Sequence, residues 1–231
     1  MDKAEFDKFA DEYLATHSEN LRISGEDPEY FARAKTVVLQ RRWKQLGLAE
    51  PKAILDFGAG IGNAWPHLVR AFPFATLTGL DVSEKSLAIA EQRFPTLATA
   101  IPYDGDRIPL ANASFDLIFS ACVFHHIPAE RHIDLFAQLK DLLAPGGRIV
   151  IFEHNPLNPV TRHIVDTCAF DENAVLISAA EMKRRQAKAG LKDVETAYTG
   201  FFPGALAALR PLERWMTALP IGAQYYTLAR G

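Results

Sequence analysis

The chain has 231 residues, of which 48% are hydrophobic and 23% charged, and its formal net charge is −3. This balance is typical of one globular domain, and the negative charge argues against a broad nucleic-acid interface. The amino-terminal residues resemble no signal peptide, and no apolar run approaches the roughly 20 residues that cross a bilayer. Cys122 and Cys168 lie in apolar stretches and are interpreted as buried free thiols. We therefore expect a cytoplasmic protein without stable membrane insertion.

Helices are expected first, over residues 3–16 and 28–46, where apolar residues recur at helical spacing. From residue 53 onward, short apolar segments alternate with amphipathic ones. They predict strands at 53–57, 76–81, 98–103, 115–124 and 148–153, with helices at 63–72, 84–94 and 131–143 between them. This alternation indicates an α/β fold with a parallel sheet that helices cover on both faces.

After residue 153 the alternation loosens into a loop with short helices. Ser178 and Glu181 have the spacing of a capping box for a helix that ends at Gly190. Two further strands are expected at 193–202 and 224–230, with a helix between them that breaks near Pro211. Seven strands are predicted in total, without an internal repeat.

Glycines at every second position follow the first strand in ILDFGAGIG, residues 54–62. Ligands of open α/β sheets bind beyond the carboxyl ends of the strands, and glycines there let the backbone approach them closely. The alternative interpretation is a tight turn that binds nothing. Asp81, 19 residues after Gly62, ends the second strand, where a carboxylate can accept both hydroxyls of a ribose.

Two ligands compete for this turn. A dinucleotide favours Gly or Ala at position 63, where the chain has Asn63. Asp56, just before the glycines, suits a ligand with a cationic amino-acid end. Asp81 permits either ligand.

Four motifs in this order resemble the class I S-adenosylmethionine-dependent methyltransferases. They are ILDFGAGIG, LTGLDVSEKSLAIAEQRF, YDGDRIPLANASFDLIFSACVFHHI and LLAPGGRIVIFE. The resemblance implies a Rossmann-like, doubly wound, mostly parallel sheet with an antiparallel final strand. It implies a single domain over 1–231, with an N-terminal helical cap at 1–50, a cofactor-binding core at 51–153 and a substrate-side segment at 154–231.

The resemblance also implies S-adenosyl-L-methionine as the cofactor and no metal. The residues expected to contact the cofactor are Asp56, Gly58, Ala59 and Gly60 at its methionine end, Asp81 and Val82 at the ribose, Asp104 and Gly105 at the adenine, and Ala121 and Cys122 by their backbone. Asp106 competes with Asp104 for its role, and Asp104 alternatively shapes the turn YDGD. Asp116 is expected to be structural.

The catalytic candidates are His125 and His126, because an acceptor hydroxyl must lose a proton and histidine titrates near neutral pH. Alternatively, these histidines bond to their loop or line the cofactor. Candidate acceptor contacts are Tyr13, Tyr30, Glu153 and His154, the two tyrosines as lid residues.

The function that we expect is methyl transfer to a small-molecule, glycan or lipid-like acceptor, with no nucleic-acid partner. A nicotinamide-dependent oxidoreductase and a non-catalytic S-adenosylmethionine-binding protein are the alternatives. The sequence leaves open the acceptor, the methylated atom, the use of a base and the oligomeric state.

Overall fold

The computed structural model describes residues 26–168 and 171–231. Their strands form one sheet in the order β3-β2-β1-β4-β5-β7-β6. The strands are β1 (Ala53–Phe57), β2 (Thr76–Asp81), β3 (Thr99–Pro102), β4 (Phe115–Ala121), β5 (Leu143–His154), β6 (Lys192–Thr199) and β7 (Gln224–Arg230). The helices are α3 (Pro28–Gln45), α4 (Trp65–Ala71), α5 (Glu84–Arg93), α6 (His132–Leu142), α7 (Pro159–Asp166) and α8 (Ala179–Lys188), with the short 3-10 segments η2 (Phe124–His126), η3 (Ala129–Arg131) and η5 (Gly204–Trp215).

The sheet has the predicted doubly wound, mostly parallel topology. The strands from β1 to β5 pair in parallel, and β7 pairs antiparallel with both β5 and β6. The strand order reverses between β1 and β4, which is the point where open α/β sheets bind ligands. The turns that follow these two strands are therefore the first place to look for a site.

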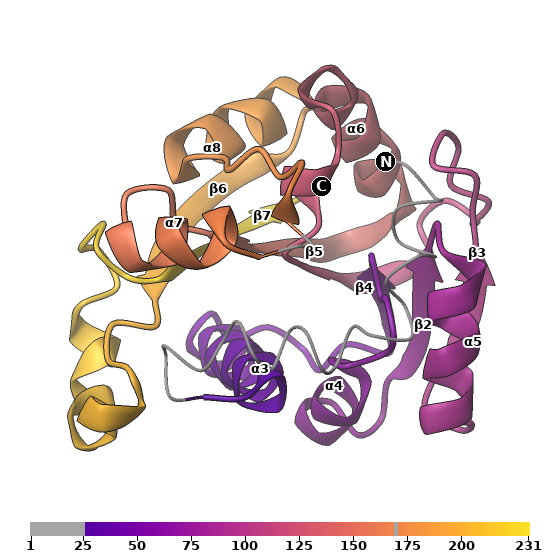
Figure 1. The fold of residues 1–231 in the computed structure, drawn as a ribbon. Helices are drawn as coiled ribbons and strands as arrows, with labels where there is room; N and C mark the ends of the chain where they lie inside the picture. Colours follow the sequence, from indigo (N-terminus) through magenta and orange to yellow (C-terminus); the bar gives the residue numbers. More distant parts are fainter. Residues whose placement is uncertain (1–25, 169–170) are drawn as a thin grey trace.

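Helices cover both faces of the sheet and bury two apolar clusters (Figure 1). On one face, Phe136 of α6 and Met182 of α8 are fully buried with the sheet residues of the first cluster. On the other face, Trp43 of α3 and Trp65 of α4 belong to the second cluster. Successive strand residues alternate between the two, since Leu55 lies in the first cluster and Ile54 in the second.

Several predicted elements differ in detail. β5 begins at Leu143 rather than at residue 148, because Leu143 already pairs with Phe115 before a shift in register. The Ser178 hydroxyl caps α8 as predicted, but the Glu181 carboxylate pairs with arginines of its own helix instead of completing the box. The predicted helix at 3–16 lies outside the described residues. Within the described ranges, no helix is both long enough and apolar enough to cross a membrane.

Candidate functional site

The glycine turn after β1 separates into packed and open positions. An ideal Cβ on Gly58 would lie 2.3 Å from Val123 Cγ2, so the turn can pack against the loop after β4 only because residue 58 has no side chain. An ideal Cβ on Gly60 would meet no heavy atom of the described residues within 4 Å, and its φ of +51° favours glycine. A Cβ on Gly58 would therefore point at Val123, whereas one on Gly60 would point into space that the described residues leave open. That the cofactor contacts the backbone of both glycines stays a prediction.

Asp56 is a buried carboxyl group with an incomplete set of partners. It is 3% exposed, and its Oδ2 has no hydrogen-bond partner among the described residues. Burial raises the pKa of Asp56 to about 7, the charge of Asp81 raises it as well, and the Trp65 indole opposes them. A cationic ligand group would supply the missing partner and favour the ionised form of the carboxyl.

Asp81 ties the glycine turn to the end of β2. Its Oδ2 accepts a hydrogen bond from the Gly60 backbone N–H at 2.8 Å, and its Oδ1 accepts one from the Ser83 N–H at 2.9 Å. These two bonds hold the carboxylate beside the glycine turn, at the carboxyl end of β2. The predicted ribose-binding acid therefore also has a structural task that the sequence analysis missed.

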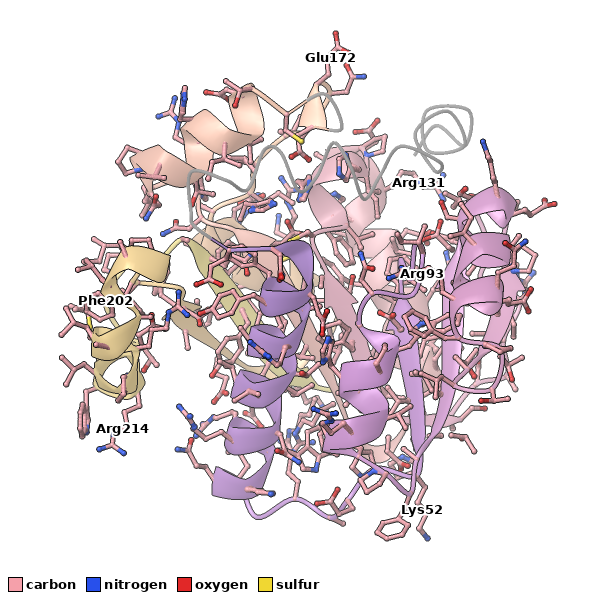
Figure 2. The ribbon with its side chains drawn as sticks, turned by 60° about the horizontal axis from the view of Figure 1, so that its bottom comes forward. Lys52, Arg93, Arg131, Glu172, Phe202 and Arg214 are labelled. Carbon is pink, nitrogen blue, oxygen red and sulfur yellow. The ribbon has the colours of Figure 1, made fainter. Side chains whose placement is uncertain are left out.

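A cation from α5 stabilises the same turn. Arg93, labelled in Figure 2, donates to the Ile61 carbonyl at 2.7 Å and to the Asn63 side-chain oxygen at 2.8 Å. Asn63 thus occupies the position where a dinucleotide turn favours a small residue, and its amide has a partner within the protein. This contact supports the interpretation that the turn was not built for a dinucleotide.

The predicted adenine end lies between the turns after β2 and β3. An ideal Cβ on Gly105 would lie 3.5 Å from Val82 Cγ1, so these two residues are neighbours. Asp104 is exposed, and its Oδ1 accepts from the N–H groups of Asp106 and Arg107, which hold its pKa below the ordinary value. The structure therefore gives Asp104 the turn-shaping role that was its alternative, whereas Asp106 pairs with Arg131.

The end of β4 is strained where it meets the site. Cys122 has a φ of +59°, which is uncommon for a residue other than glycine, and its N–H donates to the Phe152 carbonyl at 2.8 Å. Such backbone strain persists only where the surroundings impose it, and it concentrates at functional sites. Ala121, just before it, is half-buried. The backbone of both residues therefore lies at the point where the strand order reverses.

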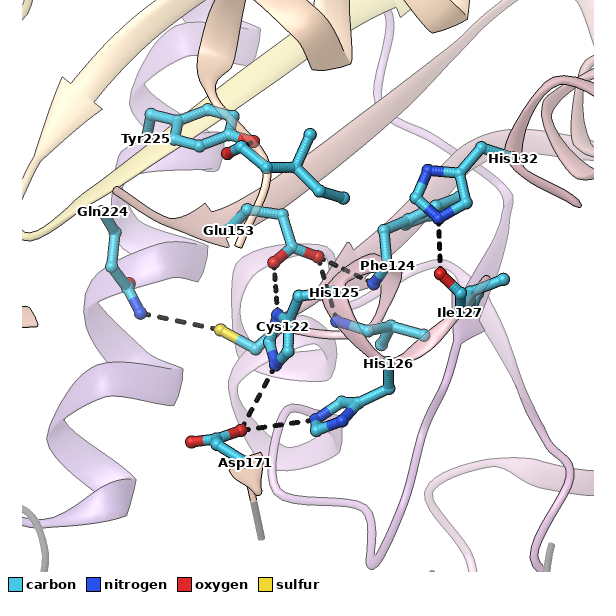
Figure 3. A network of polar contacts seen from close by, with 12 residues as sticks. Cys122, Phe124, His125, His126, Ile127, His132, Glu153, Asp171, Gln224 and Tyr225 are labelled. Carbon is cyan, nitrogen blue, oxygen red and sulfur yellow. Dashed lines mark hydrogen bonds and ion pairs between the residues drawn. The ribbon is translucent and has the colours of Figure 1, made fainter. Parts of the chain in front are cut away.

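His125 and Glu153 form a buried pair beyond the ends of β4 and β5 (Figure 3). Both side chains are 1% exposed, and His125 Nδ1 donates to Glu153 Oε2 at 2.5 Å. Glu153 Oε1 accepts from the N–H groups of Val123 and Phe124. Burial alone would lower the pKa of His125, but the charge of Glu153 and the hydrogen bonds raise it well above the usual value.

The expectation that Glu153 contacts an acceptor is wrong, because its bonds are directed into the protein. Burial raises the pKa of Glu153 most, but the charge of His125, the hydrogen bond from His125 and the hydrogen bond from the Phe124 N–H together hold it below its usual value. Glu153 therefore positions the His125 ring and the loop after β4. His154, on the opposite side of β5, has its ring centroid 5.2 Å from that of His125, and burial lowers its pKa to about 4.

Asp171 completes this cluster, and the sequence analysis did not identify it. His125 Nε2 and His126 Nε2 lie 3.4 and 3.5 Å from Asp171 Oδ1 (Figure 3). Burial and then the charge of His125 lower the pKa of His126 to about 4, so this imidazole is neutral at pH 7. No periodicity or motif marks Asp171, which stands in an irregular segment before α8.

The tyrosines that were expected to form a lid are not brought together with this cluster in the described structure. Tyr30, in the first turn of α3, lies under the guanidinium of Arg210, 4.4 Å from its ring centroid, which ties α3 to η5. Tyr13 lies outside the described residues. The other predicted residues, from the glycine turn to the histidines, lie at the carboxyl ends of the strands from β1 to β5.

The comparisons with known proteins agree with this arrangement. A family model described as a methyltransferase domain matches residues 54–147. A malonyl-(acyl-carrier protein) O-methyltransferase of Marinomonas sp. is 33% identical over 122 residues, 52% of this chain and 44% of that protein. A trans-aconitate 2-methyltransferase of Rhodopseudomonas palustris is 28% identical over 156 residues, 64% of this chain and 57% of that protein. The chain thus spans about half the length of these curated relatives.

The fold has a close counterpart among solved structures. A crystal structure described as a SAM-dependent methyltransferase of Thermotoga maritima matches with a TM-score of 0.67. The sequence identity is 18%, and the match covers 98% of each chain. At this identity the likeness shows that the two proteins share a fold, including the parts outside the matched family region.

Proposed function

We propose that the chain is a class I S-adenosylmethionine-dependent methyltransferase that transfers a methyl group from S-adenosylmethionine to a small-molecule acceptor, and the match of residues 54–147 to a methyltransferase-domain model supports this proposal. The observation that carries the proposal is the space beside Gly60 that the described residues leave open, together with Asp56 of β1, whose Oδ2 has no hydrogen-bond partner among the described residues. Both features suit a ligand with an amino-acid end. When bound, S-adenosylmethionine supplies an electrophilic methyl group on a sulfonium.

The cofactor has a place for each of its parts among the residues present. Asp56 would face its amino group, and the Gly60 backbone would border its methionine end. Asp81, whose carboxylate lies at the end of β2 beside the glycine turn, would accept the ribose hydroxyls. Val82 and Gly105, which are neighbours, would flank the adenine. Holding donor and acceptor close and aligned supplies much of the rate enhancement of such a transfer.

We propose that His125 and His126 act on the acceptor. Glu153 holds the His125 ring by Nδ1, so that Nε2 is directed away from it. His126, whose imidazole is neutral at pH 7, would take the proton of an acceptor hydroxyl, whereas the raised pKa of His125 favours its cationic form, which would attract a negatively charged acceptor. His154, on the neighbouring strand end, would contact the acceptor.

The net charge of −3 favours a small acceptor over nucleic acid. The similar proteins are named for malonyl-acyl-carrier protein and trans-aconitate, and both acceptors carry carboxylates. These two compounds are the first to test, followed by glycan and lipid-like acceptors. We also propose a cytoplasmic location, supported by two cysteines that form no disulfide.

A substitution at Gly60 tests the cofactor site. Asn tolerates the positive φ of Gly60, so Gly60→Asn should fold and place a side chain in the open space. Wild type should bind S-adenosylhomocysteine with a Kd near 1 μM or lower, about −8 kcal/mol, and Gly60→Asn should show no binding by calorimetry. Gly47→Asn is the matched control, because Gly47 has a φ of +64° and equally open surroundings at the end of α3.

Two results would oppose the proposal. One is a folded Gly60→Asn variant that binds S-adenosylhomocysteine like wild type. The other is an absence of labelled methyl transfer to every acceptor tested by a wild-type protein that binds the cofactor, which would favour a non-catalytic binding protein.

A further inference from the structure

Three side chains beyond the ends of β4 and β5 direct metal-binding atoms toward one another. They are His125 and His126, which close the turn after β4, and Asp171, which comes from the segment before α8 (Figure 3). One ring nitrogen of each histidine and one carboxylate oxygen all lie within 4.8 Å of one another. Each group is partly or fully buried, so the cluster is not a set of solvated surface charges.

The separations suit a metal ion better than hydrogen bonds. His125 Nε2 and His126 Nε2 lie 3.4 and 3.5 Å from the same Asp171 oxygen. A charge-assisted hydrogen bond between these groups would be about 2.7–2.9 Å long. Two ligand atoms, each about 2.0–2.1 Å from a zinc ion at a tetrahedral angle, are about 3.4 Å apart. The spacing therefore matches the edges of a coordination tetrahedron.

The surroundings of His125 are those of a metal-binding imidazole. Its Nδ1 donates to Glu153 Oε2 at 2.5 Å, and Glu153 is itself held by the backbone N–H groups of Val123 and Phe124. A carboxylate behind a histidine fixes the ring and the tautomer that presents Nε2 to a metal. Glu153 and Asp171 together also carry the negative charge that balances a divalent cation.

We propose that His125, His126 and Asp171 bind one divalent transition-metal ion, with a coordination position left for an oxygen of the acceptor. Two imidazoles and one carboxylate favour zinc, iron or nickel over magnesium, which prefers oxygen ligands. The binding of the ion does not depend on the proposed function, but its role does. In that role, a hydroxyl bound to the ion would release its proton to solvent more readily, and the metal would replace direct proton removal by a histidine.

The test is a titration of the full, tag-free chain after treatment with EDTA and desalting, without cofactor. Co²⁺ is the optical probe, because tetrahedral Co²⁺ gives intense visible absorption, and Zn²⁺ binding is measured by displacement of Co²⁺ and by calorimetry. We expect one equivalent of Co²⁺ to bind with tetrahedral bands and Zn²⁺ to displace it. Mg²⁺ should not compete, because the ligand set contains two nitrogens.

Two variants locate the ion. Asp171→Asn and His126→Gln remove ligands that are each 13% exposed, and each should weaken Zn²⁺ binding at least tenfold. His163→Gln is the control, because His163 is an exposed histidine of α7 outside the cluster. Circular dichroism checks that each variant is folded. Because there are two ligand variants, the test still stands if one of them does not fold.

The proposal is overturned if wild type binds neither Co²⁺ nor Zn²⁺, or if both ligand variants bind Zn²⁺ as wild type does. It is also overturned if His163→Gln weakens binding as much as they do. Since no cofactor is present in the titration, these outcomes are independent of whether the chain transfers methyl groups.

Discussion

Asp56 links the charge of the candidate cofactor site to the stability of the protein. Its pKa is raised from 3.8 to about 7 in the folded protein, chiefly by burial. Between these two values the folded protein holds a proton that the unfolded chain has released. The contribution of Asp56 to the free energy of unfolding therefore falls as the pH rises through this range, and the cost is complete above about pH 7.

We expect Asp56→Asn to remove this cost. Urea unfolding at pH 5 and at pH 8 measures the free energy of unfolding of both proteins. The advantage of the variant over wild type should be about 2–4 kcal/mol larger at pH 8 than at pH 5. An equal difference between the two proteins at both pH values would contradict the assigned pKa. The wild-type affinity for S-adenosylhomocysteine should also rise roughly tenfold from pH 6 to pH 8, because a cationic group favours ionised Asp56.

Asp81 has two tasks, and substitution should affect both. Asp81→Asn keeps one acceptor oxygen and loses the other, so one of the N–H groups of Gly60 and Ser83 loses its partner. We expect a loss of about 1–3 kcal/mol in the free energy of unfolding and at least tenfold weaker binding of S-adenosylhomocysteine. Thermal unfolding and calorimetry measure the two effects separately.

Asp116 provides the matched control for Asp81. Its carboxylate also accepts from two backbone N–H groups, those of Lys52 and Ala53, but at the opposite end of the sheet. Asp116→Asn should destabilise the protein to a similar extent and leave the affinity for S-adenosylhomocysteine unchanged. If both variants bind the ligand equally well, Asp81 has only its structural task.

At the scale of elements, the packing of two turns against each other shapes the candidate site. The turn after β1 can lie against the loop after β4 only because Gly58 has no side chain at the contact with Val123. The same loop is held from the other side by Glu153 of β5. The glycine turn, the strained Cys122 and the histidine pair therefore form one packed unit at the switch point of the sheet.

We expect Gly58→Ala to destabilise the protein by about 2–4 kcal/mol, from overpacking against Val123 and from the strain of a positive φ. A double-mutant cycle with Val123→Ala, measured by urea unfolding, tests this contact. The double variant should lose at least about 1 kcal/mol less free energy of unfolding than the two single variants lose in sum. Gly47 has a similar φ, and a Cβ there would meet no atom of residues 26–168 and 171–231 within 4 Å, so Gly47→Ala should show the cost of strain alone, about 1 kcal/mol. Strict additivity of Gly58→Ala and Val123→Ala would contradict the contact.

At the scale of the whole molecule, ligand binding should stabilise the sheet and its helices together. The proposed cofactor contacts come from the carboxyl ends of several neighbouring strands. Because these ends lie together only in the folded sheet, the ligand should bind the folded chain and not the unfolded one. At 100 times its Kd, S-adenosylhomocysteine should add about 2.7 kcal/mol to the free energy of unfolding. For a chain of this size, that corresponds to a rise in Tm of about 5–10 °C.

The comparison ligand for this experiment is NAD at the same concentration. We expect it to leave the Tm unchanged, because Asn63 and its Arg93 partner occupy the position that a dinucleotide turn keeps small. Scanning calorimetry with each ligand measures both values. An equal rise in Tm with NAD would favour the dinucleotide interpretation of the turn.

The order of strands and helices in the core was predictable because each element carries its own local signal. Apolar runs between turn residues marked β1, β2 and β4, and residues 224–230 were predicted as the strand that the structure contains. The start of β5 was not predictable, because Leu143 joins the sheet through a shift in register opposite Phe115, and such a shift leaves no periodic pattern in either strand.

The motifs of the sequence were enough to indicate the glycine turn, the acids that precede and follow it, and the histidines after β4, because each of these features is contiguous and its spacing carries the chemistry. Only the tertiary structure decided that Gly58 is packed while Gly60 is open, that Glu153 is directed toward His125, and that Asp171 joins the two histidines. The physical reason is that a local pattern indicates which positions are buried. Which side chains meet depends on how distant segments pack, and that is decided by shape and charge across the whole fold.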